Sequence, residues 1–156
     1  MIDLESIIIG LGMLLVFVVP LIYVQTKQKL NIKKYNKLCL DEAQKHQLTL
    51  SNFDVWNNGY SIGIDDKAKT LFYHLEKSDE NITHVIQLDS ISSCKSVTDK
   101  DKSNNTQKLS LLIRFKDANK PSVSLEFYNV KYRSSLFTEI PLLEKWDKLV
   151  SRALKK

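Results

Sequence analysis

Cys94 and Lys95 lie side by side in the segment SISSCKS, residues 90–96, and these are the residue types from which a thiol nucleophile is built. A neighbouring ammonium lowers the pKa of a thiol and so favours the reactive thiolate. A catalytic thiol also needs a base, and the sequence places no histidine or asparagine beside this pair. GxSxG, P-loop, GxGxxG and HExxH patterns are absent as well. We therefore predict no catalytic residue and no enzyme.

Histidines and acidic residues are the other candidates for chemistry. His46, His74 and His84 stand apart in the sequence, none with a second ligand at metal-binding spacing. His74 and His84 fall in neighbouring predicted strands, where they can meet. Asp65 and Asp66 are adjacent in a predicted turn, where aspartate bonds its own backbone. We expect the two aspartates to form hydrogen bonds within the turn, and we predict no metal site and no bound cofactor.

The two cysteines, Cys39 and Cys94, fall in different predicted elements and form no CxxC motif. Free thiols in a reducing compartment are the favoured interpretation. A disulfide between them would instead require an oxidising compartment.

The segment 7–24 contains 18 consecutive residues without a charge. As a helix it would be ~27 Å long, which approaches the thickness of a bilayer's hydrocarbon core. A cleaved secretory signal begins with basic residues and ends in small ones, whereas here Asp3 and Glu5 precede the segment and no Ala-x-Ala site follows it. We predict an uncleaved transmembrane anchor over residues 1–25, with Pro20 inside its helix.

Basic residues follow the anchor and set its orientation. Residues 25–47 carry six lysines against two acidic residues, and no Lys or Arg precedes the anchor. The positive-inside rule then places the N-terminus outside and the rest in the cytoplasm. The predicted membrane-contacting residues are Tyr23, Lys27, Lys29, Lys33 and Lys34. The lysines either only set the orientation or also bind anionic lipid headgroups.

Residues 26–47 lack glycine and proline and predict a juxtamembrane helix. Its stripe of Ile32, Tyr35, Cys39, Ala43 and His46 has helical spacing. We expect this stripe to pack on the following domain, with a second chain as the alternative.

Residues 48–156 predict an antiparallel β domain, because the hydrophobic period changes to two. The predicted strands cover residues 60–64, 71–75, 83–88, 91–97, 109–115 and 123–127. Residues 48–55 either supply a seventh strand or do not, and the polar segment 98–107 is expected to be mobile. In the last strand, Leu125 and Phe127 are expected to face the core, with Glu126 and Tyr128 on the other side.

A helix from about Glu139 to Leu154 closes the chain, with Thr138 as its expected cap and Pro141 in its first turn. Leu143, Trp146 and Val150 belong to its wide apolar face. The predicted fold class is therefore α+β: a transmembrane helix, a juxtamembrane helix, and a curved antiparallel sheet or barrel of six to seven strands capped by an amphipathic helix. This outline resembles a pleckstrin-homology-like barrel.

The segments FDVWNNGYSIGIDDKAKTLFY, VIQLDSISSCKSV, SLEFYN and LLEKWDKLV, all within residue 37 to the C-terminus, resemble a family of small uncharacterised membrane-anchored proteins from Bacteroidota-type bacteria. The resemblance implies a bacterial origin and an inner-membrane location. It transfers no functional residue.

Charge balance narrows the range of partners. Residues 48–156 hold 17 basic and 14 acidic residues, so the β domain has no nucleic-acid footprint. We expect a single-pass, non-catalytic binding or scaffold module on the cytoplasmic face, whose partners are the bilayer and an unidentified protein. The alternative is an accessory subunit of a larger membrane complex, held through its transmembrane helix.

Overall fold

The computed structural model describes the backbone of residues 4–57, 59–77, 81–132 and 138–155; before residue 32 it describes side chains only at 13, 14, 16–20 and 23. Seven strands lie between two α-helices. In chain order the elements are α1 (Leu4–Lys45), β1 (Asn52–Trp56), β2 (Tyr60–Asp65), β3 (Thr70–Glu76), β4 (Asn81–Gln87), the 3-10 turn η1 (Leu88–Ser90), β5 (Ile91–Lys100), β6 (Thr106–Phe115), β7 (Val123–Asn129) and α2 (Glu139–Ala153).

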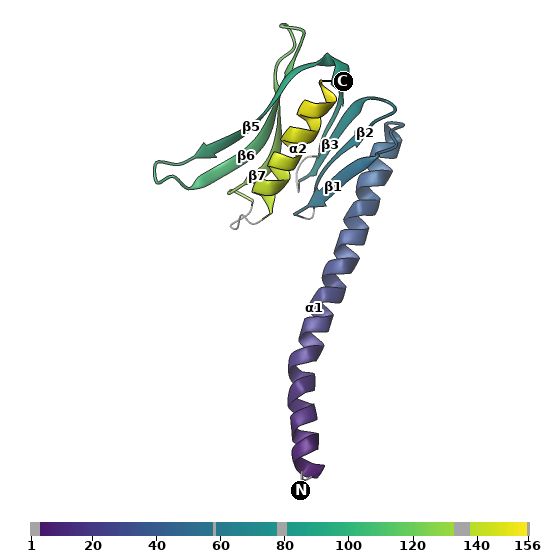
Figure 1. The fold of residues 1–156 in the computed structure, drawn as a ribbon, viewed down its shortest axis with the longest axis vertical. Coiled ribbons are helices and arrows are strands. Elements are labelled where there is room, and N and C mark those ends of the chain that lie inside the picture. The colour runs from purple at the N-terminus through teal and green to yellow at the C-terminus, as the bar shows by residue number, and fades with distance from the viewer. Residues whose placement is uncertain (1–3, 58, 78–80, 133–137, 156) are drawn as a thin grey trace.

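α1 is one helix of 42 residues, so the predicted anchor and juxtamembrane helix form a continuous rod with Pro20 inside it. Its last turns lie against the β domain, and the rest projects away from it (Figure 1). Cys39 and Ala43 are buried against Phe72. The predicted packing of the apolar stripe on the domain is thus confirmed for these two residues, whereas Ile32 and His46 are exposed.

The strands form two antiparallel sheets, ordered β1-β2-β3-β4 and β5-β6-β7. The α+β prediction is confirmed, with residues 52–56 supplying the seventh strand. Strand alternation gives the first sheet two apolar faces: Leu71, Tyr73 and Leu75 of β3 join the main core, while Phe72 turns outward to α1. On that outer face Gly63 leaves room for Leu50, which follows α1 and packs with it there. A Cβ on Gly63 would lie 2.7 Å from Leu50 Cδ1.

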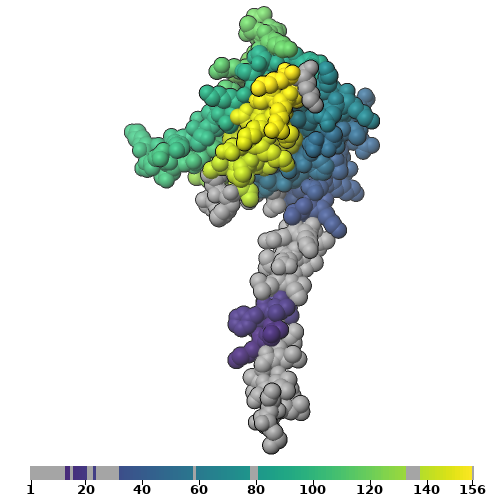
Figure 2. Space-filling view, in the orientation of Figure 1, coloured from purple at the N-terminus to yellow at the C-terminus, as the bar shows by residue number. Residues whose placement is uncertain are grey.

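β5 and β6 continue far into the polar segment that we expected to be a mobile loop. Their hairpin projects from the domain (Figures 1 and 2) and turns between Lys100 and Thr106. The carboxylate of Asp101 organises the turn by accepting the backbone N–H groups of Ser103 and Asn105, both at 2.8 Å. Local Asx hydrogen bonding, rather than apolar packing, therefore orders this segment.

The alternation predicted for the last strand is wrong at its end. A register irregularity pairs Leu109 with Tyr128 but Ser110 with Glu126, which is one residue more on β7 than on β6. This bulge turns the strand, so Glu126 and Tyr128 are buried together with Leu125 and Phe127. The Glu126 carboxylate compensates for its burial by accepting hydrogen bonds from Tyr60 Oη and Asn129 Nδ2, both at 3.0 Å.

α2 lies between the two sheets and is tied to both of them (Figure 2). Trp146 is fully buried in the core and donates from Nε1 to Asp54 Oδ2 of β1 at 2.8 Å. On the other side, Asp147 Oδ2 accepts the backbone N–H of Ser96 in β5 at 3.0 Å. Because the ties come from adjacent residues of one helix, α2 fixes the separation of the sheets.

The start of α2 differs from the predicted cap. Thr138 makes no side-chain capping hydrogen bond. The buried carboxylate of Glu139 instead accepts a hydrogen bond from the Thr138 backbone N–H at 2.9 Å, and a second one from Asn57 Nδ2. A carboxylate in the first turn suits the positive end of the helix dipole.

Replacing Trp146 with alanine should lower the free energy of unfolding by about 3–5 kcal/mol, because it leaves a large cavity in a rigid core. Lys148→Ala, on the exposed side of the same helix, should change it by less than about 0.5 kcal/mol. Chemical denaturation of both variants measures the difference. Equal stabilities would show that α2 does not hold the sheets together.

Candidate functional site

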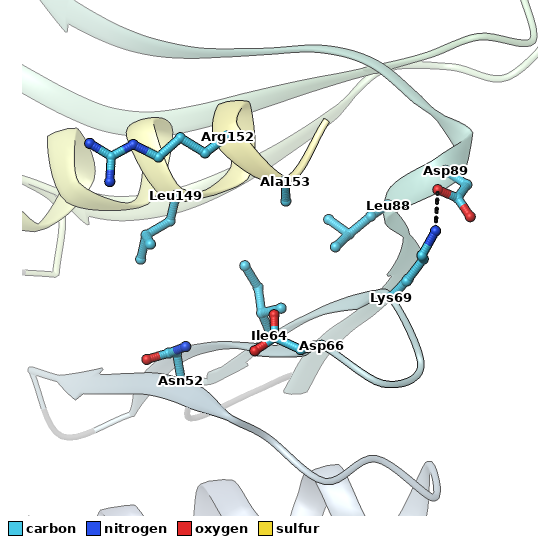
Figure 3. A pocket seen from close by; sticks show the side chains of 9 residues that line it. All are labelled: Asn52, Ile64, Asp66, Lys69, Leu88, Asp89, Leu149, Arg152 and Ala153. Carbon is cyan, nitrogen blue, oxygen red and sulfur yellow. Dashed lines mark ion pairs between the residues drawn. The ribbon is translucent and has the colours of Figure 1, made fainter. Parts of the chain in front are cut away.

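A cavity of about 560 Å³ opens where the last turns of α2 pass over the first sheet (Figure 3). We call it the α2 cavity. Its lining comes from β1, β2, the β2–β3 turn, η1 and α2, and consists of Asn52, Ile64, Asp66, Lys69, Leu88, Asp89, Leu149, Arg152 and Ala153.

Apolar side chains form the walls of the α2 cavity. Leu149 and Ala153 point down from α2, Ile64 points up from β2, and Leu88 points in from η1 (Figure 3). The core beneath them is closed by Ile64 and Leu88, both buried. The walls are therefore continuous with the main core, and the partly buried Leu149 and Ala153 offer apolar surface that water solvates poorly.

Charged groups form the rim of the α2 cavity. Lys69 Nζ lies 3.7 Å from Asp89 Oδ1 in an exposed ion pair. Asp66 accepts a hydrogen bond from Ser51 Oγ, which fixes its carboxylate at the edge of the cavity. Apolar walls with a few convergent polar groups, in a volume of a few hundred Å³, are typical of ligand-binding sites. The arrangement is suited to binding an apolar group whose attached polar atoms meet the rim.

Cys94, the sequence candidate for a nucleophile, is half-buried between β5 and α2. Burial raises the pKa of its thiol to about 12, and the nearby carboxylate of Asp147 adds to the effect. The pKa of Cys39 is also raised by burial. Both thiols are free, as predicted. The environment of Cys94 thus opposes thiolate formation, and adjacency to Lys95 in sequence does not change that.

His74 and His84 lie on neighbouring strands but do not meet. Register pairs His74 with Thr83 and Tyr73 with His84, so the two rings lie on opposite faces of the sheet. His74 Nδ1 is 2.8 Å from Thr83 Oγ1 on the α1 side, and burial lowers the pKa of both imidazoles. Within the described residues, no group of three or more His, Cys, Asp or Glu side chains is placed to hold a metal ion.

Asp65 makes the turn hydrogen bonds expected of it. Its Oδ1 accepts the backbone N–H of Ala68 at 2.9 Å and of Lys67 at 3.0 Å, and its Oδ2 accepts that of Thr49 at 2.7 Å. The hydrogen bonds from the Ala68 and Thr49 backbone lower the pKa of this carboxyl. Asp65 therefore ties the end of α1 to the β2–β3 turn, and only Asp66 reaches the α2 cavity.

The predicted membrane-contacting residues all belong to α1. Tyr23, Lys33 and Lys34 are exposed, and Lys34 Nζ lies 5.7 Å from the centre of the Tyr35 ring. The side chains of Lys27 and Lys29 lie outside the described residues, as do most side chains of the predicted anchor. Among the residues that were described, no helix combines the length and the apolar character needed to cross a membrane.

Sequence reasoning missed the residues of the α2 cavity. Lys69 and Asp89 belong to two separate turns, and Arg152 lies in α2, far along the chain from both. No periodicity links them, because the fold alone brings the β2–β3 turn and η1 to the C-terminal end of α2. The available signal was the polar turn residues that follow the predicted strands 60–64 and 83–88, which end in the apolar Ile64 and Leu88.

Comparison with models of protein families, with curated proteins and with solved structures found no match to this chain.

Both thiols should react with a disulfide reagent at pH 8 at least a hundredfold more slowly in the folded protein than in urea, because burial holds the pKa of Cys94 at about 12 against the usual ~8.5. The Cys94 rate, followed in a Cys39→Ala variant, should still be rising above pH 9. A rate that levels off below pH 8 would indicate an activated thiol and revive the nucleophile hypothesis.

Proposed function

We propose that this protein is a non-catalytic binding module tethered to a membrane through α1, and that the α2 cavity is where it binds a protein partner. The observation that carries the proposal is the combination of apolar walls and a charged rim in a cavity of about 560 Å³. The site favours an apolar side chain of a peptide, because the peptide backbone on either side would meet Lys69, Asp89 and Asp66.

The membrane part of the proposal is supported by the uncharged segment 7–24 and by the lysines that follow it. Several apolar side chains of this segment are exposed in the isolated chain: Met13, Leu14, Val16, Phe17 and Val19. Lipid would remove them from water. With the N-terminus outside, the β domain lies on the cytoplasmic side of a bacterial inner membrane. Lys33 and Lys34 are then within reach of anionic headgroups.

The architecture is consistent with a pleckstrin-homology-like module. Seven strands in two antiparallel sheets and one C-terminal helix make up the domain. The α2 cavity is lined by residues of the last turns of α2. The C-terminal end of α2 lies at the end of the domain remote from the N-terminus of α1 (Figure 1). A partner in the α2 cavity would therefore approach from the cytoplasm and not from the bilayer.

Ala153→Phe should abolish partner binding at the α2 cavity, because Ala153 lines it and the larger ring would occupy it. A photoreactive benzophenone amino acid in place of Lys67, which is exposed in the β2–β3 turn between the rim residues Asp66 and Lys69, would report binding as a discrete crosslinked adduct in native membranes. Lys148→Phe adds the same ring to the exposed side of α2 and should leave the adduct intact. An adduct that is absent, or that is equal in both variants, contradicts the proposed site.

The alternative function, an accessory subunit held through its transmembrane helix, is favoured by the same exposed apolar residues of α1. Replacing residues 7–24 with an unrelated apolar helix of equal length separates the two functions. The crosslinked adduct from position 67 should persist if the α2 cavity recruits the partner. Its loss would indicate that the helix itself holds the chain in a complex.

A further inference from the structure

β4 is the last strand of the first sheet, and it is hydrogen-bonded to β3 only. A strand at the edge of a sheet offers a row of N–H and C=O groups to any extended chain that reaches it. Natural proteins therefore cover or blunt most of their edge strands. We call the side of β4 that is remote from β3 the β4 edge.

The register of β3 and β4 shows which backbone groups lie on the β4 edge. The Leu88 N–H donates to Lys69 O at 2.8 Å, and this bond continues the pairing of the two strands. Residues of an antiparallel strand direct both backbone groups alternately toward the partner strand and away from it. The even-numbered residues of β4 thus bond to β3, whereas Thr83 and Val85 direct their N–H and C=O groups outward. Within the described residues, these outward groups have no hydrogen-bond partner.

Solvent reaches β4 from both faces of the sheet. Val85, on the outer face, has an exposed fraction of 42%, although Phe72, which is paired with it on β3, is fully buried beneath α1. The cover provided by α1 therefore stops between β3 and β4. On the inner face His84 is only half-buried, while Tyr73, its partner on β3, is buried. The open β4 edge accounts for the exposure on both faces.

β4 has none of the features that protect an edge strand. Its seven residues, NITHVIQ, include no Lys, Arg, Asp, Glu or Pro, and they pair with β3 without a register irregularity. Burial lowers the pKa of His84, so this side chain is neutral at pH 7. Four of the seven residues are β-branched, a type that favours extended backbone. The strand is thus regular, uncharged and suited to pairing.

The edge strands that contact α2 are protected. The Asp147 carboxylate accepts the Ser96 N–H of β5 at 3.0 Å, and β5 has register irregularities near both of its ends. On β1, the charged side chain of Asp54 points to α2 and accepts a hydrogen bond from Trp146 Nε1. A covering helix, an irregular register and a charge are the usual means of preventing strand addition.

The edge strand β7 is protected by side chains of the first sheet. Tyr73 Oη donates to Glu126 O at 2.6 Å, and Trp56 Nε1 donates to Phe127 O at 3.0 Å. The bulge in β7 adds a local irregularity. β4 is thus the edge strand that the described part of the chain leaves open.

The direction of α1 favours a different protein over a second copy as the occupant of the β4 edge. A symmetric antiparallel pair of β4 strands has its two-fold axis perpendicular to the sheet. α1 runs along the outer face of that sheet, since Cys39 and Ala43, one turn apart, both pack there. The axis would therefore reverse the direction of the second α1. Given the membrane tether proposed above, two such chains could not insert α1 in one membrane.

We infer that the β4 edge is a second binding site, which takes up an extended segment of another protein as an added strand. The outward backbone groups of Thr83 and Val85 hydrogen-bond the segment. A β-branched or aromatic side chain of the segment lies beside Val85, and the absence of charge on β4 favours uncharged residues at the pairing positions. No described residue of β4 lines the α2 cavity, so the two sites are separate.

Hydrogen exchange of the full-length chain tests the β4 edge. In nanodiscs of phosphatidylcholine, the amides of Thr83 and Val85 should exchange at least about tenfold faster than the β4 amides that bond to β3. In native membranes, where the other protein is present, this difference should disappear. Slow exchange of both amides in nanodiscs would show that the chain covers its own edge. Fast exchange that persists in native membranes would show that no strand adds there, and either result overturns the inference.

Crosslinking in native membranes identifies the occupant. A benzophenone amino acid in place of Gln87, exposed at the end of β4, should give a discrete adduct. Val85→Lys should lower its yield at least about fivefold because lysine blunts an edge strand, whereas Val85→Thr, still β-branched, should preserve it. Circular dichroism checks that both variants are folded.

Two outcomes of the crosslinking overturn the inference. One is an equal yield in Val85→Lys and Val85→Thr, and the other is an adduct of twice the mass of the chain, which would identify a second copy as the occupant. Ala153→Phe, which fills the α2 cavity, should leave the adduct from position 87 intact. Failure of the α2 cavity as a partner site is therefore distinguishable from failure of the β4 edge.

Discussion

The contact between the last turns of α1 and the outer face of the first sheet determines what each part of the molecule faces. Cys39 and Ala43 are buried against Phe72, and Asp65 binds the backbone of Thr49 just beyond the helix. Because α1 is continuous from Leu4 to Lys45, a domain fixed at one end of the rod has a defined direction relative to the other end. A flexible linker at this point would leave the direction of the domain relative to α1 undefined.

Within the domain, α2 packs between two sheets that are not hydrogen-bonded to each other. Trp146 fills the core between them, and Asp54 and Asp147 tie the helix to β1 and β5. The last turns of the same helix pass over the first sheet, where Leu149 and Ala153 cover only part of the apolar surface beneath them. The α2 cavity is thus a consequence of how α2 holds the core together. The stability of the core and the proposed binding site therefore depend on adjacent turns of one helix.

Proposed function and fold combine in a simple way. The two ends of the domain differ in chemistry: one has lysines around a buried carboxylate with exposed apolar groups, and the other has an apolar cavity with a mixed-charge rim. The second is the site that we propose for an apolar side chain of a peptide.

The sequence by itself determined the order and type of the elements, since period-two and helical hydrophobic patterns reflect local backbone geometry. It also predicted the free thiols and the turn role of Asp65. It failed where distant segments meet: the β7 bulge that buries Glu126, the opposite faces of His74 and His84, and the α2 cavity built from two turns and a helix end. Register, bulges and helix docking depend on contacts between residues far apart in the chain. Only the tertiary structure decided them, because local patterns contain no information about which distant side chains share a space.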